Sequence, residues 1–248
     1  MKIIPLSEGA FTVDKTKQFV PFDTSKDNLQ ERSAGSLLVE IQPFCIVTQK
    51  DIIVIDTGLG FKNPDGILQI HQNLLDNGIN PMDVTKVLMS HLHKDHAGGI
   101  AIKDEVLNQQ FLSFPHATYY VNKDEFAFAL ENNKSSYWPE QFSILSGSDK
   151  MIFTAGDGVI DNYIHYGVTG AHCPYHQVFW IKENDQTIFF GGDVAPQLQQ
   201  MKSRFIAKYD YDGKKCMELR QQWWQQGQEE KWTFLFYHDI KTPVFSFE

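Results

Sequence analysis

Cysteine is scarce in this sequence, and so are long apolar runs. The 248 residues include three cysteines, Cys45, Cys173 and Cys216, which are too few and too scattered for the disulfide framework of a secreted protein. No run of about eighteen apolar residues is present, so no membrane span is predicted. The first residues, MKIIPLSEGAF, turn polar too early for a signal peptide. We therefore expect a cytoplasmic protein with no membrane partner.

Positive charge is also in short supply. The chain has 22 lysine and arginine residues against 31 aspartate and glutamate residues, which gives a formal net charge of −9. Proteins that bind nucleic-acid phosphates usually present a basic face, so we expect no nucleic-acid partner. Low-complexity tracts, flexible linkers and short internal repeats are absent as well. With 42% apolar residues, a chain of this length can bury a sizeable core without disulfide bonds.

The apolar pattern predicts strands in both halves of the chain. Short apolar runs that suit strands occupy residues 36–49, 51–58, 84–91, 159–168, 177–183, 187–193 and 232–238. By contrast, the segment 11–34 is polar, and we expect it to form a surface loop or lid.

Three helices are expected between these strands. The first spans residues 63–81, begins at the N-cap Asp65 and ends at Gly78. Its predicted buried stripe consists of Ile67, Leu68, Leu74 and Leu75. A second helix begins at Asn122, where Glu125 comes close to completing a capping box, and a third lies around residues 214–226. Strands and helices mix in both halves, which favours two sheets packed face to face with helices outside.

Three of the nine histidines fall in the run HLHKDH, residues 91–96. Alternate side chains of a strand share a face, so we expect His91 and His93 to point the same way at the end of the strand 84–91. Asp95 and His96 follow directly, where the chain turns toward two glycines. Polar turns favour Asn, Gly and Ser over histidine, so this run indicates one half of a metal site.

Three further residues of metal-ligand type follow apolar strands. His172 comes after the strand 159–168, Asp193 ends the run IFFGGD, and His238 ends the run FLFYH. A lone histidine or aspartate at the end of a strand is more often a loop residue whose hydrogen bonds are satisfied. Together they repeat one design, in which several strands each deliver one ligand to a common edge.

This ordered set of motifs resembles the metallo-β-lactamase superfamily. In that family a strand ends in Asp-Thr-Gly, here residues 56–58, and HxHxDH, a His-containing turn, a strand-end Asp and a late His follow. The resemblance implies an α/β fold over a single domain, residues 1–248, in which helices flank an αββα sandwich of two mixed β-sheets. It also implies that one metal is held by His91, His93 and His172, that the second is held by Asp95, His96 and His238, and that Asp193 bridges both. Asp56 would be a structural residue beside the site.

The donor atoms narrow the metal and the reaction that the resemblance implies. Imidazole and carboxylate without thiolate suit zinc, and also iron or manganese. Relatives with two irons tend to carry Glu at the position of His93, so two Zn²⁺ ions are expected. We therefore expect a dinuclear, lactonase-like zinc hydrolase, in which a metal-bound hydroxide oriented by Asp95 attacks an ester or lactone carbonyl of a small-molecule substrate. Two such ions would also make the pocket of an acidic chain electropositive.

Several residues depart from the family's pattern. The motif that often reads Gly-His-Thr-Pro-Gly-His is AHCPYH here, residues 171–176. Tyr175 replaces glycine. We expect it either to act as a catalytic residue that narrows the pocket or donates a hydrogen bond to substrate, or merely to pack on the turn. Cys173 is expected to be inert packing, and His176 to support the ligands without being one. The tyrosine that acyl-homoserine lactonases carry shortly after the bridging aspartate is missing after Asp193.

Two other functions fit the same motifs. A phosphodiesterase of the same fold uses a similar metal pair, and a mononuclear iron dioxygenase of the persulfide type keeps a similar HxHxDH. We expect substrate choice to depend on lid segments 11–34 and 134–150. Lys94, the cation within the histidine run, should point outward, because its charge would be repelled by two metals.

Overall fold

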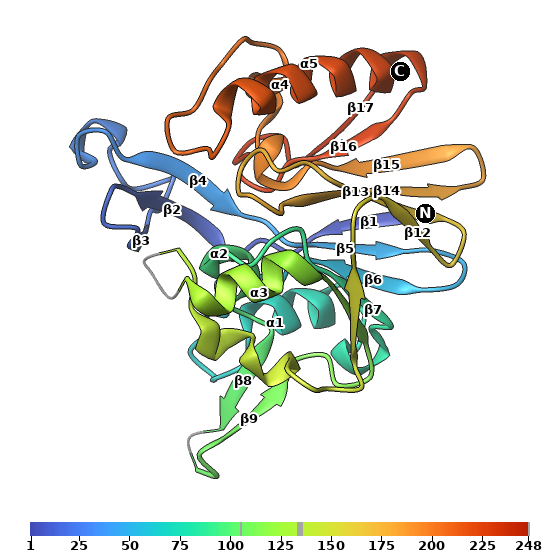
Figure 1. Cartoon of the computed structure of the whole chain (residues 1–248). Coiled ribbons are helices and arrows are strands. Elements are labelled where there is room, and N and C mark those ends of the chain that lie inside the picture. Colours follow the sequence, from blue (N-terminus) through green and yellow to red (C-terminus); the bar gives the residue numbers. More distant parts are fainter. Residues whose placement is uncertain (105, 133–135, 248) are drawn as a thin grey trace.

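Two six-stranded sheets form the centre of the computed structural model, which describes residues 1–104, 106–132 and 136–247 (Figure 1). The strand order of the first sheet is β1 (Lys2–Pro5), β5 (Phe44–Val47), β6 (Ile52–Ile55), β7 (Lys86–Leu88), β10 (Thr118–Asn122) and β11 (Met151–Thr154). The order of the second is β12 (Gly158–Ile160), β13 (Ile164–Val168), β14 (Gln177–Glu183), β15 (Gln186–Phe190), β16 (Thr233–Leu235) and β17 (Val244–Ser246).

Helices and two small sheets surround this centre. The helices are α1 (Gln69–Asp76), α2 (Lys94–Ala97), α3 (Lys123–Glu131), α4 (Leu198–Met201) and α5 (Gly213–Glu229). Short 3-10 helices occupy Leu29–Glu31, Pro81–Asp83, Pro139–Gln141, Ser143–Leu145 and Gly192–Val194. The small sheets consist of β3 (Phe19–Pro21), β2 (Gly9–Val13) and β4 (Leu37–Ile41), and of β8 (Ala101–Asp104) with β9 (Gln109–Leu112). Among the described residues, no helix is long and apolar enough to cross a membrane.

Side chains alternate across the central strands, so each large sheet contributes to two cores. In β6, Ile53 and Ile55 pack in the core between the sheets, whereas Val54 packs on the opposite face. Successive residues of a strand point to opposite faces, so a strand that is buried on both sides needs a continuous apolar run. The strand predicted within residues 51–58 is confirmed for this reason.

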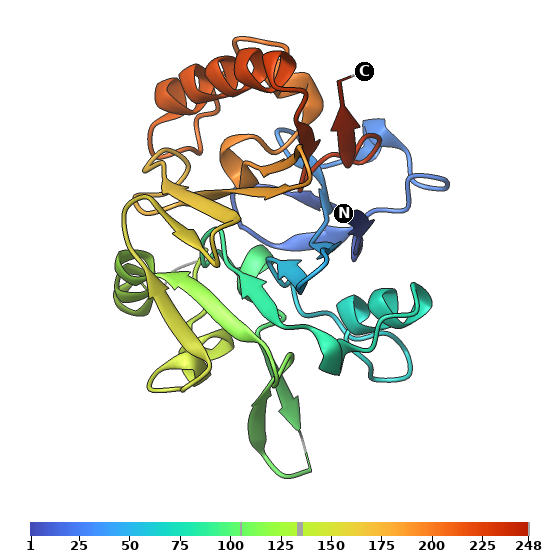
Figure 2. The same cartoon turned by 90° about the vertical axis from the view of Figure 1, so that its right-hand side faces the viewer.

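Helices cover the outer face of each large sheet. Leu74 of α1 and Phe126 of α3 belong to the core beneath the first sheet. Trp223 of α5 packs against Phe189 of the second sheet, with ring centroids 4.9 Å apart. Both sheets contain parallel and antiparallel pairs, and Figures 1 and 2 show α5 on the side of the molecule opposite α1 and α3. The predicted αββα sandwich of two mixed sheets is confirmed.

The helix predicted over residues 63–81 starts later than expected. α1 begins after Leu68, which makes no side-chain cap. Asp65 is not its N-cap, because Asn63 Oδ1 accepts hydrogen bonds from two backbone N–H groups that follow it and closes a turn there. Such turns compete with a helix start. The predicted end is confirmed, since Gly78 stops the helix with a φ of 76°.

The buried face of α1 also differs from the predicted stripe. Ile70, Leu74 and Leu68 are buried, whereas Ile67 and Leu75 are exposed by 38% and 47%. The helix begins at Gln69, so Ile70 and Leu74, which are four residues apart, lie on the face that packs against the sheet. The later start of the helix therefore explains the error in the stripe.

Asn122 caps α3 as predicted. Its Oδ1 accepts hydrogen bonds of 3.0 Å from the backbone N–H groups of Asp124 and Glu125. Glu125 does not complete a capping box, because its buried carboxylate accepts a hydrogen bond from the Leu92 N–H instead. The helix start thereby holds the backbone of the HLHKDH run.

Two predicted segments contain more regular structure than expected. Residues 159–168 form the hairpin β12–β13, in which Asp161 and Asn162 both adopt the positive φ that a tight hairpin turn requires. Segment 11–34 is only partly a loop, because β2 pairs with both β3 and β4 in a small sheet at the edge of the molecule (Figure 1). Residues 134–135 of the second predicted lid lie outside the described residues.

Gly98 packs against the loop that follows β6. A Cβ atom at Gly98 would lie 2.2 Å from the Leu59 carbonyl oxygen, so Gly98→Ala should lower the free energy of unfolding by about 2–3 kcal/mol, measured by urea denaturation. Gly66→Ala is the control, because a Cβ atom added at Gly66 would have no atom within 4 Å. Its positive φ should cost only about 1 kcal/mol. Equal losses in the two variants would contradict the packing argument.

Candidate metal centre

The HLHKDH run leaves the first sheet earlier than predicted. β7 ends at Leu88, so His91 and His93 do not lie on a strand. His93 is the N-cap residue of the short helix α2, which carries Asp95 and His96. The turn from extended backbone into helix still brings the two imidazoles together, with His91 Nε2 3.0 Å from His93 Nδ1.

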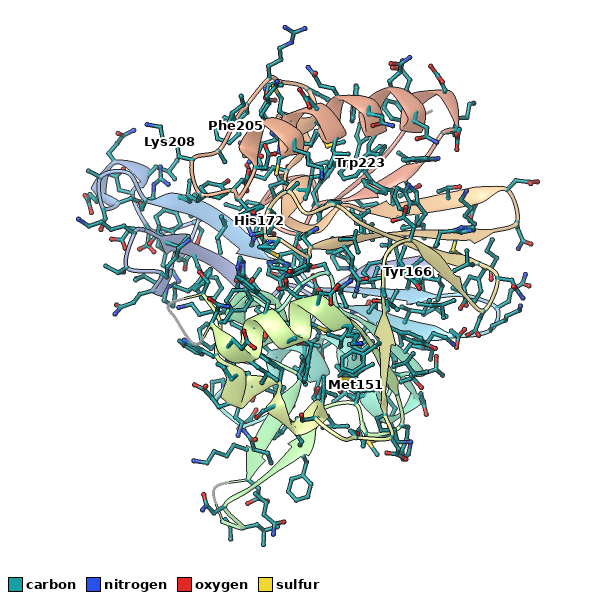
Figure 3. The ribbon with its side chains drawn as sticks, in the orientation of Figure 1. Met151, Tyr166, His172, Phe205, Lys208 and Trp223 are labelled. Carbon is teal, nitrogen blue, oxygen red and sulfur yellow. The ribbon has the colours of Figure 1, made fainter. Side chains whose placement is uncertain are left out.

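The first group of donors joins these two imidazoles to the second sheet. His172 Nε2 lies 3.2 Å from His93 Nδ1 and 3.3 Å from Asp193 Oδ2. His172 stands in the turn between β13 and β14, and Asp193 in the 3-10 helix after β15. Figure 3 shows His172 at the centre of the molecule, between the layers. The four donors of His91, His93, His172 and Asp193 lie within 4.8 Å of one another.

The second group of donors lies on the other side of Asp193. Asp193 Oδ1 is 3.1 Å from His96 Nε2 and 3.0 Å from His238 Nε2. Asp95 Oδ2 lies 3.7 Å and 3.6 Å from the same two nitrogens. His238 follows β16, so this group also joins both sheets. The structure therefore brings together all seven residues predicted as ligands, with one oxygen of Asp193 directed to each group.

The donor atoms fit divalent metal ions. A tetrahedral zinc ion with bonds of about 2.0–2.1 Å places its ligand atoms roughly 3.3 Å apart, which is close to the separations within both groups. His96 Nε2 and Asp193 Oδ1 are buried and lie 3.1 Å apart, but neither makes a hydrogen bond of regular geometry with a described residue. Buried polar atoms without a partner are rare in native proteins. Cations between the donors would satisfy both atoms.

The first group is poised to bind a cation with neutral imidazoles. Burial holds the pKa of His91 and of His93 well below the usual range of histidine, and neighbouring imidazoles lower both further. Only an unprotonated imidazole nitrogen can bind a metal. Low pKa values therefore keep these nitrogens available as ligands.

The second group holds charge when no cation is present. Burial disfavours the charged form of His96, but Asp193, Asp95 and Asp56 outweigh it and raise its pKa well above the usual range. The pKa of His238 is raised against burial by Asp193. His238, His96 and His172 in turn hold the pKa of Asp193 well below its usual range despite burial. A bound metal ion would take over the positive charge that these imidazolium groups supply.

Each of three ligand histidines is fixed through its second ring nitrogen. His96 Nδ1 lies 2.8 Å from Asp56 Oδ2, and Asp56 also accepts hydrogen bonds from the Ser90 N–H and hydroxyl. His238 Nδ1 donates to the Glu40 carbonyl oxygen at 2.7 Å. Such partners select the tautomer that aims Nε2 at the metal. The predicted structural place of Asp56 beside the site agrees with these contacts.

Asp210 is the partner of His172, and sequence reasoning missed it. Its Oδ1 lies 2.8 Å from His172 Nδ1, and backbone hydrogen bonds from Tyr211 to His172 and from Asp212 to Ala171 fix the segment there. This segment, between α4 and α5, has no periodic pattern. An aspartate flanked by two tyrosines was the only signal in the sequence.

Tyr237 contacts two members of the second group of donors, His96 and Asp95. Its ring stacks on His96, with centroids 4.0 Å apart and an interplanar angle of 21°. Its hydroxyl donates to the Asp95 carbonyl oxygen at 2.6 Å. The residue before His238 therefore orients both the ring and the backbone of two other predicted ligands.

Cys173 is buried, and its thiol lies 3.4 Å from a carboxylate oxygen of Glu125. Burial raises the pKa of Cys173 well above the usual range, and the negative charge of Glu125 adds to the effect. A thiol that stays protonated is neither a good nucleophile nor a good ligand. The environment agrees with the expectation that Cys173 is inert packing.

Lys94 does not point into solvent, so that prediction is wrong. The side chain is 6% exposed, and its ammonium group donates to the Lys17 carbonyl oxygen. It also lies over the ring of Trp138 at 4.6 Å from the centroid. The long stem can reach the loop before β3, and these contacts satisfy the charge without placing it against the metal ligands.

A cavity of about 850 Å³ opens onto both donor groups. Its lining includes Phe19, Leu37, Tyr137, Phe205 and Tyr209, together with His93, His172 and His238. Figure 3 shows Phe205 on the loop above His172. Tyr175 is not part of this lining. Its ring packs 5.9 Å from that of Phe128, and its catalytic role stays a prediction.

The family described as the metallo-beta-lactamase superfamily matches the chain over residues 41–223. The N-acyl homoserine lactonase AttM of Agrobacterium fabrum is 27% identical over 141 aligned positions, and the match covers 52% of this chain and 48% of that protein. The corresponding protein of Rhizobium radiobacter is 26% identical over the same shares. The chain therefore spans about half the length of the curated relatives it matches.

Solved structures have the same fold. A probable metal-dependent hydrolase from Staphylococcus aureus aligns with a TM-score of 0.79 at 22% identity, over 99% of this chain and 91% of that one. The dizinc quorum-quenching lactonase AidC aligns with a TM-score of 0.72 at 18% identity, over 98% and 88% of the two chains. At these identities the likeness shows the αββα fold alone.

Asp210 should control metal affinity without controlling the fold. Asp210→Asn keeps the shape but can also donate a hydrogen bond, so the tautomer of His172 is no longer fixed. We expect zinc affinity to fall about 10- to 100-fold, measured by competition with a chromophoric chelator. Asp65→Asn, an exposed change, is the control and should leave the affinity as it is. An unchanged affinity in Asp210→Asn would contradict the positioning role.

Glu8 should make the metal-free protein less stable as pH rises. Its Oε2 accepts a hydrogen bond from the Leu59 N–H, while its buried Oε1 has no hydrogen-bond partner in the described part of the chain. Burial raises the pKa of Glu8 to about 8. The folded state therefore binds the proton more tightly than the unfolded state, whose pKa is about 4.3. This contribution is complete below about pH 4 and is lost as pH rises through about 8.

Glu8→Gln removes that titration. Relative to this variant, the wild-type protein should lose stability between about pH 5 and 8, on the order of a few kcal/mol, in urea denaturation with a chelator present. Glu131→Gln, at an exposed position, is the matched control. If the free energy of unfolding depended on pH in the same way for the wild type and Glu8→Gln, the prediction would be wrong.

Proposed function

The chain belongs to the metallo-beta-lactamase superfamily, and from that premise we propose that it is a metal-dependent hydrolase with two divalent ions. We propose further that both ions are zinc and that the enzyme cleaves an ester or lactone bond of a small molecule. The ligands would be His91, His93 and His172 for one ion and Asp95, His96 and His238 for the other, with Asp193 shared.

The observation that carries the proposal is the position of Asp193 between two groups of donors. One oxygen lies 3.3 Å from His172 Nε2 and the other 3.0 Å from His238 Nε2. A site for a single ion needs only one such group. The carboxylate that faces both groups therefore supports a pair of ions.

The choice of zinc rests on the donor atoms. Imidazole nitrogen and carboxylate oxygen suit zinc, although they also suit iron and manganese. The nearest thiol, that of Cys173, is buried beside Glu125 and stays protonated. No thiolate is therefore expected among the ligands.

The chain's own residues divide the work of hydrolysis between them. When bound, the two ions would activate a water molecule at neutral pH and polarise the carbonyl oxygen of the substrate. Asp95 lines the cavity and would orient the attacking water by accepting its hydrogen bond. The apolar walls around Phe19 and Leu37 would hold the acyl portion of the substrate and exclude bulk water.

Tyr209 is our candidate for the group that assists the departing oxygen. It lines the cavity with its ring centroid 6.4 Å from that of His172. Tyr209 is 42% exposed, and its partial burial together with the charges of Asp210 and Asp193 raises its pKa to about 12. The hydroxyl therefore keeps its proton and can donate it to a hydrogen bond. Tyr209 comes from the segment between α4 and α5. It would therefore take, from a different place in the chain, the role of the tyrosine that is missing directly after Asp193.

The relatives named as N-acyl homoserine lactonases support a lactone as the bond that is cleaved. The match covers only about half of each relative, so the substrate of this chain is part of our proposal. Metal content and a substrate panel together test it.

Protein purified without added metal should contain two zinc ions per chain by elemental analysis. It should hydrolyse esters or lactones, and Asp193→Ala should lose both the metal and at least about 1,000-fold in kcat/KM, because both ions lose a ligand. Asp65→Ala is the control for a lost carboxylate. One iron per chain and oxygen uptake with a persulfide as substrate, or turnover of bis-p-nitrophenyl phosphate without ester or lactone turnover, would overturn the proposal.

A further inference from the structure

One wall of the cavity is cationic, although the chain as a whole is acidic. Lys15, Lys17 and Lys94 line the cavity on the side of the β2–β3 hairpin. None of the three forms an ion pair with a carboxylate among the described residues. Three cations therefore gather at one cavity, although the chain as a whole has a net charge of −9.

The hairpin loop that carries Lys17 is held in a defined shape. Asp14 Oδ1 accepts hydrogen bonds from the Thr16 N–H at 2.8 Å and from the Thr16 hydroxyl at 2.6 Å. The Lys17 N–H donates to the Asp14 carbonyl oxygen at 3.0 Å, and Lys17 has a φ of 59°. These contacts close a tight turn at the mouth of the cavity.

Lys94 ties this turn to the metal-ligand segment. Its ammonium group donates to the Lys17 carbonyl oxygen, and its backbone N–H donates to the Ser136 carbonyl oxygen at 2.8 Å. The ammonium also lies over the rings of Trp138 and Phe19, at 4.6 Å and 5.6 Å from their centroids. The charge of Lys94 is therefore occupied in holding the loop, whereas the ammonium of Lys17 is left for a ligand.

Lys17 and the candidate metal centre share one cavity. The lining that includes Lys17 also includes His93, His172 and Asp193. An anion bound by Lys17 would therefore lie beside the ions that the centre holds. Such an anion would reach both the cation and the reacting bond.

Four carboxylates also line the cavity and offset the charge of the three lysines, namely those of Asp14, Asp95, Asp193 and Asp210. Two divalent ions together with the three lysines would outweigh these four carboxylates. The loaded cavity is therefore positive, and a positive cavity with apolar walls attracts and retains anions.

We propose that the substrate is an anionic ester or lactone, whose carboxylate or phosphate group is bound by Lys17 with support from Lys15. This inference rests on the proposed hydrolase function and narrows its substrate class. Lys17 provides a point charge on a fixed loop, which recognises charge with little demand on the shape of the anion. The apolar residues Phe19 and Leu37 on the same wall would contact the uncharged part of the molecule.

The test compares lactones that differ only in charge. The probes are γ-butyrolactone bearing a γ-carboxylate, the methyl ester of the same acid, and the analogue bearing a phosphate on a γ-hydroxymethyl group. Turnover is followed as opening of the lactone ring, because the methyl ester has a second bond that a hydrolase could cleave. The zinc-loaded wild type should favour the charged lactones over the methyl ester in kcat/KM by about tenfold or more, the size expected for one hydrogen bond to a charged group. The two anions distinguish a carboxylate substrate from a phosphate one.

The variant Lys17→Met keeps the aliphatic stem and removes the charge. It should lower the ratio of kcat/KM for the charged lactone over the methyl ester about tenfold, through KM, with two metals still bound. Lys214→Met, on the exposed face of α5 and 76% exposed, is the matched control and should keep the wild-type ratio. The wild-type ratio should also fall as ionic strength rises.

A binding measurement separates failure of this inference from failure of the proposed function. Glutarate should bind the zinc-loaded wild type at least about tenfold more tightly than it binds Lys17→Met by calorimetry, whether or not any lactone is hydrolysed. The metal ions contribute equally to the affinity of both proteins for glutarate, so the ratio of the two affinities reports the contribution of Lys17. Equal affinity in the two proteins, or a wild type that prefers the methyl ester, would overturn the inference.

Discussion

The architecture depends on the interaction of one buried carboxylate with imidazoles from both sheets. Asp193 faces His172 with one oxygen and His96 and His238 with the other, all within 3.3 Å. A buried carboxylate is costly unless positive charge and hydrogen bonds compensate it. The raised pKa values of His96 and His238 show how the metal-free protein supplies that charge. Divalent cations would supply it more completely, so the binding of metal and the stability of the fold are coupled.

The sandwich supplies the rigidity that such a site needs. The donors follow strands of both sheets, and the core between the sheets fixes their relative position. The second nitrogen of each of three ligand histidines is held by a different group, namely Asp56, Asp210 or the Glu40 carbonyl oxygen. Ring orientation is thus determined by the protein before any ion arrives. Preorganisation of this kind keeps donor atoms at productive separations.

Much of the fold and the donor set could be predicted because both have short-range signals. The run 177–183 is β14 residue for residue, since apolar strands between turn residues are readable locally. Asp65 was misassigned because Asn63 closes a competing turn, and such competition depends on backbone geometry that composition does not encode. Asp210 lies in a segment without a repeat, so only the folded chain shows that it reaches His172. The inward position of Lys94 depends on aromatic residues distant in sequence, Trp138 among them.

The proposed metal chemistry and the proposed substrate recognition belong to different parts of the molecule. The donors lie on turns that the two large sheets position, and a change there alters both groups at once through Asp193. The wall that carries Lys17 belongs instead to the small sheet β3–β2–β4 and contributes no donor. Its links to the donors include Lys94, which lies within the HLHKDH run and donates to the Lys17 carbonyl, and the Glu40 carbonyl of β4, which accepts a hydrogen bond from His238. Substitutions in the hairpin can therefore change which molecule is bound while the reacting centre keeps its geometry, which is how one metal site can serve many substrates.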